Sequence, residues 1–178
     1  MESPRVDHAI IVEAETGKVH EITAGATADA LQYEIFGRKV VMNEMFEEMN
    51  EIVRKNPFAQ HIGMELLEVT EGYALGRIRL AKQYENIYGG MHGGCAYSLA
   101  DTLSGIAAST YGEYVTTLDA SMNYLLPVEH TEYVYCKAKV LRHGRKITVV
   151  RVELLNDEQT LLIDGSFTFY NIGKRNEK

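Results

Sequence analysis

A glycine-rich loop that runs directly into an apolar segment decides how this chain folds. The loop reads Asn86-Ile87-Tyr88-Gly89-Gly90-Met91-His92-Gly93-Gly94. Residues 95–109 follow it with apolar and mostly small side chains on nearly every face, which is typical of a helix buried on all sides. We therefore predict a central helix over residues 95–109, and its small side chains allow a sheet to pack closely against it.

Six β-prone runs surround this helix. Turn residues separate them, among them Glu71-Gly72 between the first two runs, Pro127 after the third and Asn156-Asp157-Glu158 before the last. The runs are residues 62–69, 73–80, 115–125, 133–142, 147–155 and 160–170. One buried helix and five or six mostly antiparallel strands predict an α+β fold in which the sheet wraps around a central helix.

Residues 1–41 differ from the rest of the chain. Residues 8–12 and 18–22 are two short β-prone runs joined by Glu15-Thr16-Gly17, which indicates a β-hairpin. Residues 42–53 then repeat apolar side chains at steps of three and four, and Asn56-Pro57 ends this predicted helix. We expect an accessory extension over residues 1–41 and the main domain over residues 42–178. Whether the extension is a working hairpin, an upstream extension or foreign sequence stays open at this level.

The composition predicts a soluble domain. The chain has 178 residues, of which 46% are hydrophobic and 24% charged, and its two cysteines, Cys95 and Cys136, are too few for a disulfide scaffold. It contains no apolar stretch long enough to span a membrane and no hydrophobic leader, so we expect a cytoplasmic protein without membrane insertion. The net charge of −7 argues against a nucleic-acid partner.

The charge is unevenly distributed along the chain. Residues 1–60 carry a net charge of −5, whereas residues 131–151 carry +5. The second set consists of Lys137, Lys139, Arg142, Arg145, Lys146 and Arg151 against Glu132. Such a stretch is either a solvated strand face or a binding site for a small polyanion.

Two features near the predicted helix suggest chemistry. The Gly93-Gly94 pair opens the helix, where unpaired backbone N–H groups can polarise a carbonyl. Asp101 lies in the middle of the same apolar helix, where a carboxylate is costly unless it is paired or used. It either serves in a site or accepts hydrogen bonds from a neighbouring strand through Thr116 or Thr117. His92 fits a loop or capping residue better than a base. No second ligand stands at the spacing a metal site needs, so we expect neither metal nor cofactor.

The spacing of these features has a consequence for assembly. Eight residues of helix separate Gly93 from Asp101, which is ~12 Å along one helix axis. The two groups therefore cannot contact one substrate carbonyl within one chain. If both act on the same carbonyl, two central helices must pair antiparallel in a homodimer.

The segment Asn86-x5-His92-Gly93-Gly94-x6-Asp101, followed by the strand residues 117–124 and by Pro127, resembles the hotdog-fold acyl-CoA thioesterases of the phenylacetic-acid-degradation type, the PaaI-like family. The resemblance extends over residues 56–172 and includes the Gly144-Arg145 step. It implies hydrolysis of an acyl-CoA thioester to free CoA and a carboxylic acid. It also implies a homodimer, and dimers in this family commonly pair into tetramers.

The resemblance implies roles for particular residues. Asp101 would be the catalytic carboxylate, as general base or as nucleophile, with Thr117 positioning the attacking water. The partner subunit would supply Gly93, whose amide polarises the carbonyl, and Asn86, which orients the water or thioester. His92 would shape the loop rather than act as an essential base.

The substrate contacts that the resemblance implies are less specific. Gly94 and Tyr97 would contact substrate, and Arg145 and Lys146 would bind the phosphates of CoA. The acyl pocket walls would include Tyr97, Leu103, Met122 and Tyr124, which do not rank one acyl group above another.

Two residues of this chain bear on which chemistry the resemblance implies. Ile106 stands where one branch of hotdog dehydratases has a catalytic His, which disfavours that chemistry, and Cys95 is expected to be a small buried residue. Two rivals to the enzyme remain open: a hotdog domain that binds acyl-CoA as sensor or carrier without turnover, and a structural oligomer with a vestigial site.

Overall fold

In the computed structural model, the described residues are 8–12, 19–23, 32–35, 38–41 and 43–175, and they divide into two compact units after Glu47. The first unit contains two antiparallel hairpins. β1 (His8–Val12) pairs with β2 (Val19–Thr23), the two runs in which the sequence predicts strands, and the residues of their predicted turn lie outside the described ranges. β3 (Gln32–Ile35) pairs with β4 (Arg38–Val41), a hairpin that the sequence analysis does not predict.

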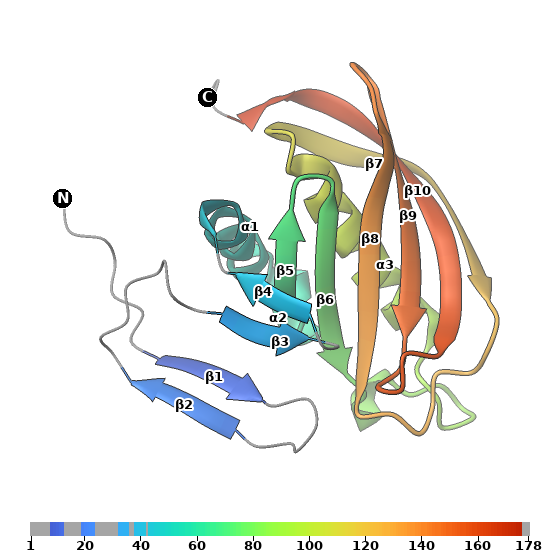
Figure 1. The fold of residues 1–178 in the computed structure, drawn as a ribbon. Helices are drawn as coiled ribbons and strands as arrows, with labels where there is room; N and C mark the ends of the chain where they lie inside the picture. The colour runs from blue at the N-terminus through green and yellow to red at the C-terminus, as the bar shows by residue number, and fades with distance from the viewer. Residues whose placement is uncertain (1–7, 13–18, 24–31, 36–37, 42, 176–178) are drawn as a thin grey trace. The chain divides into compact units, whose positions relative to one another are not determined.

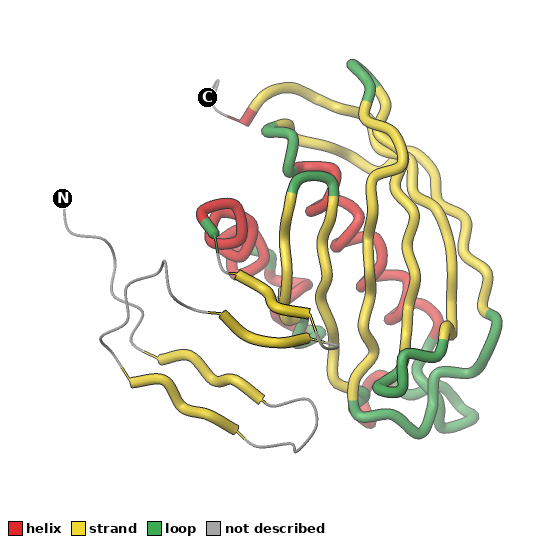
Figure 2. The backbone as a smooth tube through the Cα atoms, in the orientation of Figure 1, coloured by secondary structure: helices red, strands yellow, loops and turns green. Residues whose placement is uncertain are grey.

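The second unit is a six-stranded antiparallel sheet curved around one helix, α3 (Gly93–Ser109) (Figures 1 and 2). Its strand order is β5-β6-β8-β9-β10-β7. The strands are β5 (Glu65–Thr70), β6 (Tyr73–Arg79), β7 (Glu113–Tyr124), β8 (Tyr133–His143), β9 (Ile147–Leu155) and β10 (Leu161–Lys174). The predicted α+β arrangement is confirmed, with six strands. No helix in the described ranges is both long enough and apolar enough to span a membrane.

Two helices precede the sheet. α1 (Glu44–Lys55) crosses the division between the units and ends just before Asn56, where the sequence predicts. The expectation of a strand from residue 62 is wrong at its start, because residues 62–64 form the turn after α2 (Pro57–His61) and β5 begins at Glu65. The Asn56 side chain accepts hydrogen bonds from the N–H groups of Phe58 and Ala59, and Pro57 occupies the first helical position, so Asn-Pro starts a helix as well as ending one.

The concave face of the sheet covers one side of α3. Ala96, Leu99, Ala100 and Leu103 are all fully buried. The buried Ser104 hydroxyl donates to the Ala100 carbonyl, so the helix satisfies its own polar side chain. The prediction of a helix buried on all sides is right only for the face toward the sheet, because Gly94 and Tyr97 are exposed and Asp101 is half-buried. The helix starts earlier than predicted, because His92 caps it and both glycines join its first turn.

β7 forms one edge of the sheet. It pairs with β10 along its whole length, with irregularities after Thr168 and Asn171, and it has no second neighbour among the described strands. Its middle is exposed at residues 116–119, and Leu118 is 56% exposed. A long edge strand with exposed apolar side chains is a surface on which another strand can pair.

Close approach between β6 and α3 leads to a prediction about stability. A Cβ on Gly76 would lie 2.8 Å from the Glu65 carbonyl oxygen and 2.9 Å from a Leu103 methyl carbon. Gly76→Ala should therefore lower the free energy of unfolding by about 1–3 kcal/mol, because overpacking forces the helix or the strand to shift. Gly173→Ala is the matched control, since a Cβ there has no neighbour within 4 Å. Urea denaturation of both variants measures the difference, and equal midpoints would contradict the prediction.

Candidate active site

The loop before α3 is held in shape by Asn86. Its side-chain Oδ1 accepts from the Tyr88 N–H at 2.8 Å, and its Nδ2 donates to the Met91 carbonyl at 3.3 Å. Its backbone N–H donates to the Gly90 carbonyl at 2.7 Å. Asn86 therefore braces the loop with both ends of its amide, and one Nδ2 hydrogen remains for another acceptor.

His92 is the N-cap of α3. Its Nδ1 accepts a hydrogen bond from the Gly94 N–H at 2.9 Å, and its carbonyl accepts from Cys95 and Ala96. The expectation that His92 shapes the loop agrees with this geometry. Because Gly94 has its N–H paired with His92, the first amide of the helix, that of Gly93, is the one without an acceptor in the described part of the chain.

Tyr124 lies against this first turn. Its hydroxyl donates to the Gly93 carbonyl at 3.0 Å, and a Cβ on Gly93 would lie 3.2 Å from the Tyr124 ring. Burial, followed by the nearby Tyr97, raises the pKa of Tyr124, which keeps its hydroxyl protonated as a donor. A Cβ on Gly94 would meet His92 at 3.1 Å, so each glycine of the pair leaves room for a different aromatic side chain.

Asp101 lies in the middle of α3, half-buried, beside β7. The Thr117 hydroxyl donates to Asp101 Oδ1 at 2.8 Å. Among the described residues no hydrogen bond reaches the other carboxylate oxygen, Oδ2. This contact was expected if Asp101 accepts hydrogen bonds from the neighbouring strand, whereas the site interpretation assigned Thr117 to positioning the attacking water.

The predicted site residues fall into two separate clefts. Asp101 and Thr117 line a cleft of about 410 Å³ between α1, α3 and β7, named here the Asp101 cleft. Asn86 and Gly93 line a cleft of about 460 Å³ beside Tyr124 and residues 125–129, the Gly93 cleft. The two clefts share no lining residue. Asp101 and Gly93 therefore line different clefts, in keeping with the eight residues of helix between them.

The predicted pocket walls are only partly found at the clefts. Tyr124 lines the Gly93 cleft, but Tyr97 lines neither cleft and instead packs its ring 5.4 Å from Phe167. Burial first, and then Asp101 and Asp119, raise the pKa of Tyr97. Leu103 was expected in the pocket and is instead fully buried beneath Gly76, because the sheet packs against that face of α3.

Cys95 is half-buried in the first turn of α3. Burial raises the pKa of the Cys95 thiol, which disfavours the thiolate that a nucleophile requires. Nothing in its surroundings contradicts its expected role as a small residue.

The basic pair Arg145 and Lys146 forms the exposed turn between β8 and β9 and lines neither cleft. The Lys146 Nζ donates to the Tyr170 hydroxyl at 3.0 Å, and this contact raises the pKa of Lys146. Asn171 holds the backbone of the turn, because its Nδ2 donates to the Gly144 carbonyl at 2.7 Å and its N–H to the Lys146 carbonyl at 2.9 Å.

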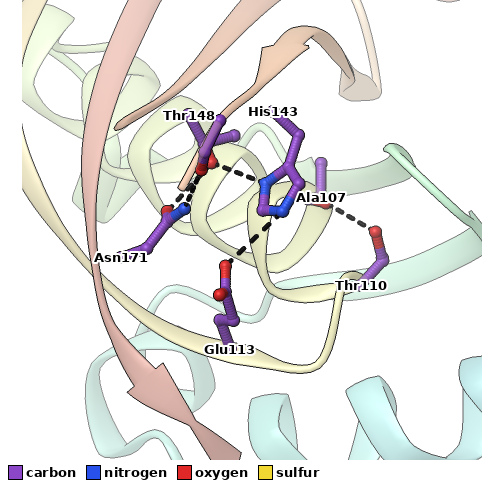
Figure 3. Close-up of polar contacts among 7 residues, drawn as sticks. Ala107, Thr110, Glu113, His143, Thr148 and Asn171 are labelled. Carbon is purple, nitrogen blue, oxygen red and sulfur yellow. Dashed lines mark hydrogen bonds and ion pairs between the residues drawn. The ribbon is translucent and has the colours of Figure 1, made fainter. Parts of the chain in front are cut away.

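A polar network supports this turn from beneath (Figure 3). Since the Asn171 amide is oriented by its bond to Gly144, its Oδ1 must accept from the Thr148 hydroxyl at 2.9 Å. That hydroxyl has one hydrogen, so the His143 Nδ1 donates to Thr148 at 2.9 Å. The His143 Nε2 faces Glu113 Oε2 at 3.6 Å. The network thus joins the ends of β7, β8, β9 and β10.

The chain resembles known thioesterases in sequence and in structure. A family model described as the thioesterase superfamily matches residues 88–163. The acyl-coenzyme A thioesterase PaaI of Escherichia coli is 26% identical over 101 residues, which cover 57% of this chain and 72% of that protein.

Two solved structures extend this likeness. The structure of the Escherichia coli PaaI protein superposes with a TM-score of 0.70 at 22% identity and covers 73% of this chain and 94% of that one, which shows a common fold. A hypothetical thioesterase protein from Streptococcus pneumoniae, solved with coenzyme A, superposes with a TM-score of 0.62 at 26% identity; the match covers 64% of this chain and 89% of that one.

The family match and these likenesses support a PaaI-like hotdog thioesterase. The family match includes His92, Gly93, Asp101 and Thr117, and the resemblance drawn from their spacing is thereby confirmed. Asn86 and all of α1 lie outside the matched residues.

The hotdog fold also gathers residues at the Asp101 cleft that the sequence analysis did not select. One cleft wall comes from α1, and Arg175 contributes from beyond β10. The α1 residues are Met49, Ile52 and Val53, and Asn56 lines the cleft from just beyond the helix. The amphipathic pattern of α1 predicted an apolar face but did not indicate that this face lines the Asp101 cleft. No sequence signal indicated Arg175, which lies in a polar C-terminal segment.

The hydrogen-bond network beneath the turn of Arg145 and Lys146 predicts that removal of the Thr148 hydroxyl lowers the stability of the protein. Thr148 is fully buried, and Thr148→Val removes the acceptor of His143 and the donor to Asn171 without a change in shape. The free energy of unfolding should fall by about 1–3 kcal/mol, since both partners lose their hydrogen bonds. Thr168→Val on β10 is the control, because that side chain makes no hydrogen bond among the described residues. A shift in urea midpoint no larger than that of Thr168→Val would contradict this account.

Proposed function

We propose that this protein hydrolyses acyl-CoA thioesters to free CoA and a carboxylic acid, at sites that each combine the Asp101 cleft of one subunit with the Gly93 cleft of its partner. The proposal rests on two groups that lie in different clefts. One is the Asp101 carboxylate, whose Oδ2 accepts no hydrogen bond from the described residues, and the other is the Gly93 N–H at the start of α3, which has no acceptor among them. The likeness to an acyl-coenzyme A thioesterase and to a thioesterase solved with coenzyme A supports the substrate class.

The reaction follows from the groups available. The partner's Gly93 N–H donates a hydrogen bond to the thioester carbonyl oxygen and stabilises the negative charge that develops there, assisted by the positive end of α3. Asp101 removes a proton from the attacking water, and the C–S bond then breaks as the proton passes to the CoA sulfur. Thr117 donates to Oδ1 and so directs Oδ2 toward the water. Attack by Asp101 itself, followed by hydrolysis of the anhydride, uses the same groups.

The exposed edge of the molecule supports the dimer that this site requires. β7 is unpaired on one side among the described strands, and the segment that follows it exposes large apolar side chains. Tyr124, Leu125 and Leu126 are 52%, 53% and 46% exposed. Pairing β7 with the β7 of a second copy would extend the sheet, bury these side chains and bring the two α3 helices together antiparallel.

Arg145 and Lys146 are proposed to hold the CoA phosphates. Their turn is exposed, carries two positive charges and has its backbone fixed by Asn171, so little ordering is needed on binding.

Replacement of the carboxylate tests the reaction directly. Asp101→Asn keeps the shape and the bond from Thr117 but removes the base, so kcat should fall about a hundredfold or more across a panel of acyl-CoAs. CoA release, followed with a thiol reagent, measures the rate. Glu158→Gln, which changes an exposed carboxylate in the turn between β9 and β10, is the control and should keep wild-type activity. Equal rates for wild type and Asp101→Asn would exclude this role, and tight binding of acyl-CoA without turnover would favour the sensor or carrier.

Mixed dimers test the sharing of the site. Gly93→Pro removes the N–H at a helix position that tolerates proline, and each of Asp101→Asn and Gly93→Pro alone should be inactive. Random assortment of the two chains makes half the dimers mixed, and each mixed dimer regains one intact site, so about a quarter of the wild-type activity should return. Circular dichroism confirms that both variants fold. Absence of recovery in a confirmed mixture would mean that each chain holds a complete site.

A further inference from the structure

The Asp101 cleft extends beyond the reacting groups and ends at an arginine. Its walls are mainly apolar and come from α1, α3 and β10. These wall residues are Met49, Ile52, Val53, Ile106 and Phe169. Arg175 is a charged lining residue of the same cleft, and its side chain is only 10% exposed.

The lengths of two elements, α3 and β7, show that Arg175 lies far from Asp101. Along α3, Ser109 lies eight residues beyond Asp101, ~12 Å at the helical rise. Along β7, Glu113 lies four residues before Thr117, ~13 Å at the strand rise. The Arg175 N–H donates to the Gly112 carbonyl at 2.9 Å, and the preceding Lys174 pairs with Glu113. The arginine therefore marks the end of the cleft opposite the carboxylate.

The guanidinium of Arg175 is only partly satisfied. Its Nη2 lies 3.2 Å from a Glu48 carboxylate oxygen, and its Nη1 donates to the Met49 sulfur at 3.5 Å, a weak acceptor. Its Nε is buried and has no hydrogen-bond partner among the described residues. Since Glu48 is half-exposed and a thioether accepts poorly, the buried guanidinium lacks the second strong acceptor that a planar fork normally binds.

We propose that Arg175 recognises the distal end of the acyl group, so that the preferred substrates carry an oxygen acceptor there, best a carboxylate, as in the CoA monothioesters of dicarboxylic acids. This inference rests on the proposed thioesterase function. The thioester lies at Asp101, the methylene chain runs along the apolar walls, and the terminal carboxylate accepts from the guanidinium. An acyl chain that ends in a methyl group buries it against unpaired N–H donors, which costs binding energy.

A purely structural role for Arg175 makes a different prediction. The ion pair with Glu48 joins the end of β10 to α1, and loss of that contact alone would lower stability and change the rates on all substrates by the same factor. A change in selectivity between chains of equal length is therefore the deciding measurement.

The experiment compares matched pairs of substrates. Values of kcat/KM are measured for suberoyl-CoA, 8-hydroxyoctanoyl-CoA and octanoyl-CoA, and for adipoyl-CoA against hexanoyl-CoA, with wild type and Arg175→Met. Wild type should favour the ω-carboxylate over the methyl end by roughly tenfold to a hundredfold, with the hydroxyl between them. Arg175→Met should abolish or invert this preference, whereas Lys174→Met, an exposed neighbour, should preserve it.

Binding of the acyl-CoAs can be measured without hydrolysis. Titration calorimetry of suberoyl-CoA and octanoyl-CoA into Asp101→Asn, with and without Arg175→Met, should show the same preference in Kd. Arg175→Gln, which keeps a neutral donor, serves if the methionine variant unfolds. If the enzyme hydrolyses octanoyl-CoA as well as or better than suberoyl-CoA, and neither substitution of Arg175 changes this ratio, the proposed role of Arg175 is wrong. The proposed thioesterase function is not affected by that outcome. Selective binding without hydrolysis overturns the thioesterase and supports the arginine.

Discussion

The close approach of α3 to the sheet is the constraint on which the rest of the molecule depends. Gly76 of β6 leaves the space into which Leu103 inserts, and alanines along α3 let the strands curve around it. A larger residue at this contact would push the helix away from the concave face, and the strands would lose the shared core. With the helix axis fixed in this way, every group on α3 has a set position along the sheet.

The division of the candidate site follows from that fixed helix. Gly93 stands at the end where the chain enters, capped by His92 and covered by Tyr124, while Asp101 opens two turns later beside Thr117. A straight helix cannot bring its first amide and its eighth following residue to one atom. The exposed edge of β7 offers the surface on which a second chain can complete both halves.

The ends of the strands carry polar groups that serve different purposes. Beneath the turn at residues 144–146, His143, Thr148 and Asn171 bond one another, and Asn171 also binds the backbone of the turn. At the end of β10, Arg175 is buried with one side of its guanidinium lacking an acceptor. Satisfied networks stabilise a structure, whereas an unsatisfied buried donor beside a cleft indicates a place for a ligand acceptor.

The sequence by itself determined the arrangement of one buried helix in an antiparallel sheet, because hydrophobic periodicity and turn residues are local signals. It also determined that Gly93 and Asp101 are too far apart to act together in one chain, since helical rise depends only on residue count. It missed the helix at residues 57–61, because the Asn-Pro pair that ends α1 also caps a new helix.

Only the tertiary structure decided that Leu103 belongs to the core and that Arg175 reaches the Asp101 cleft, because both depend on which elements pack against each other across long separations in the chain. No periodicity in a polar C-terminal segment can specify such a contact.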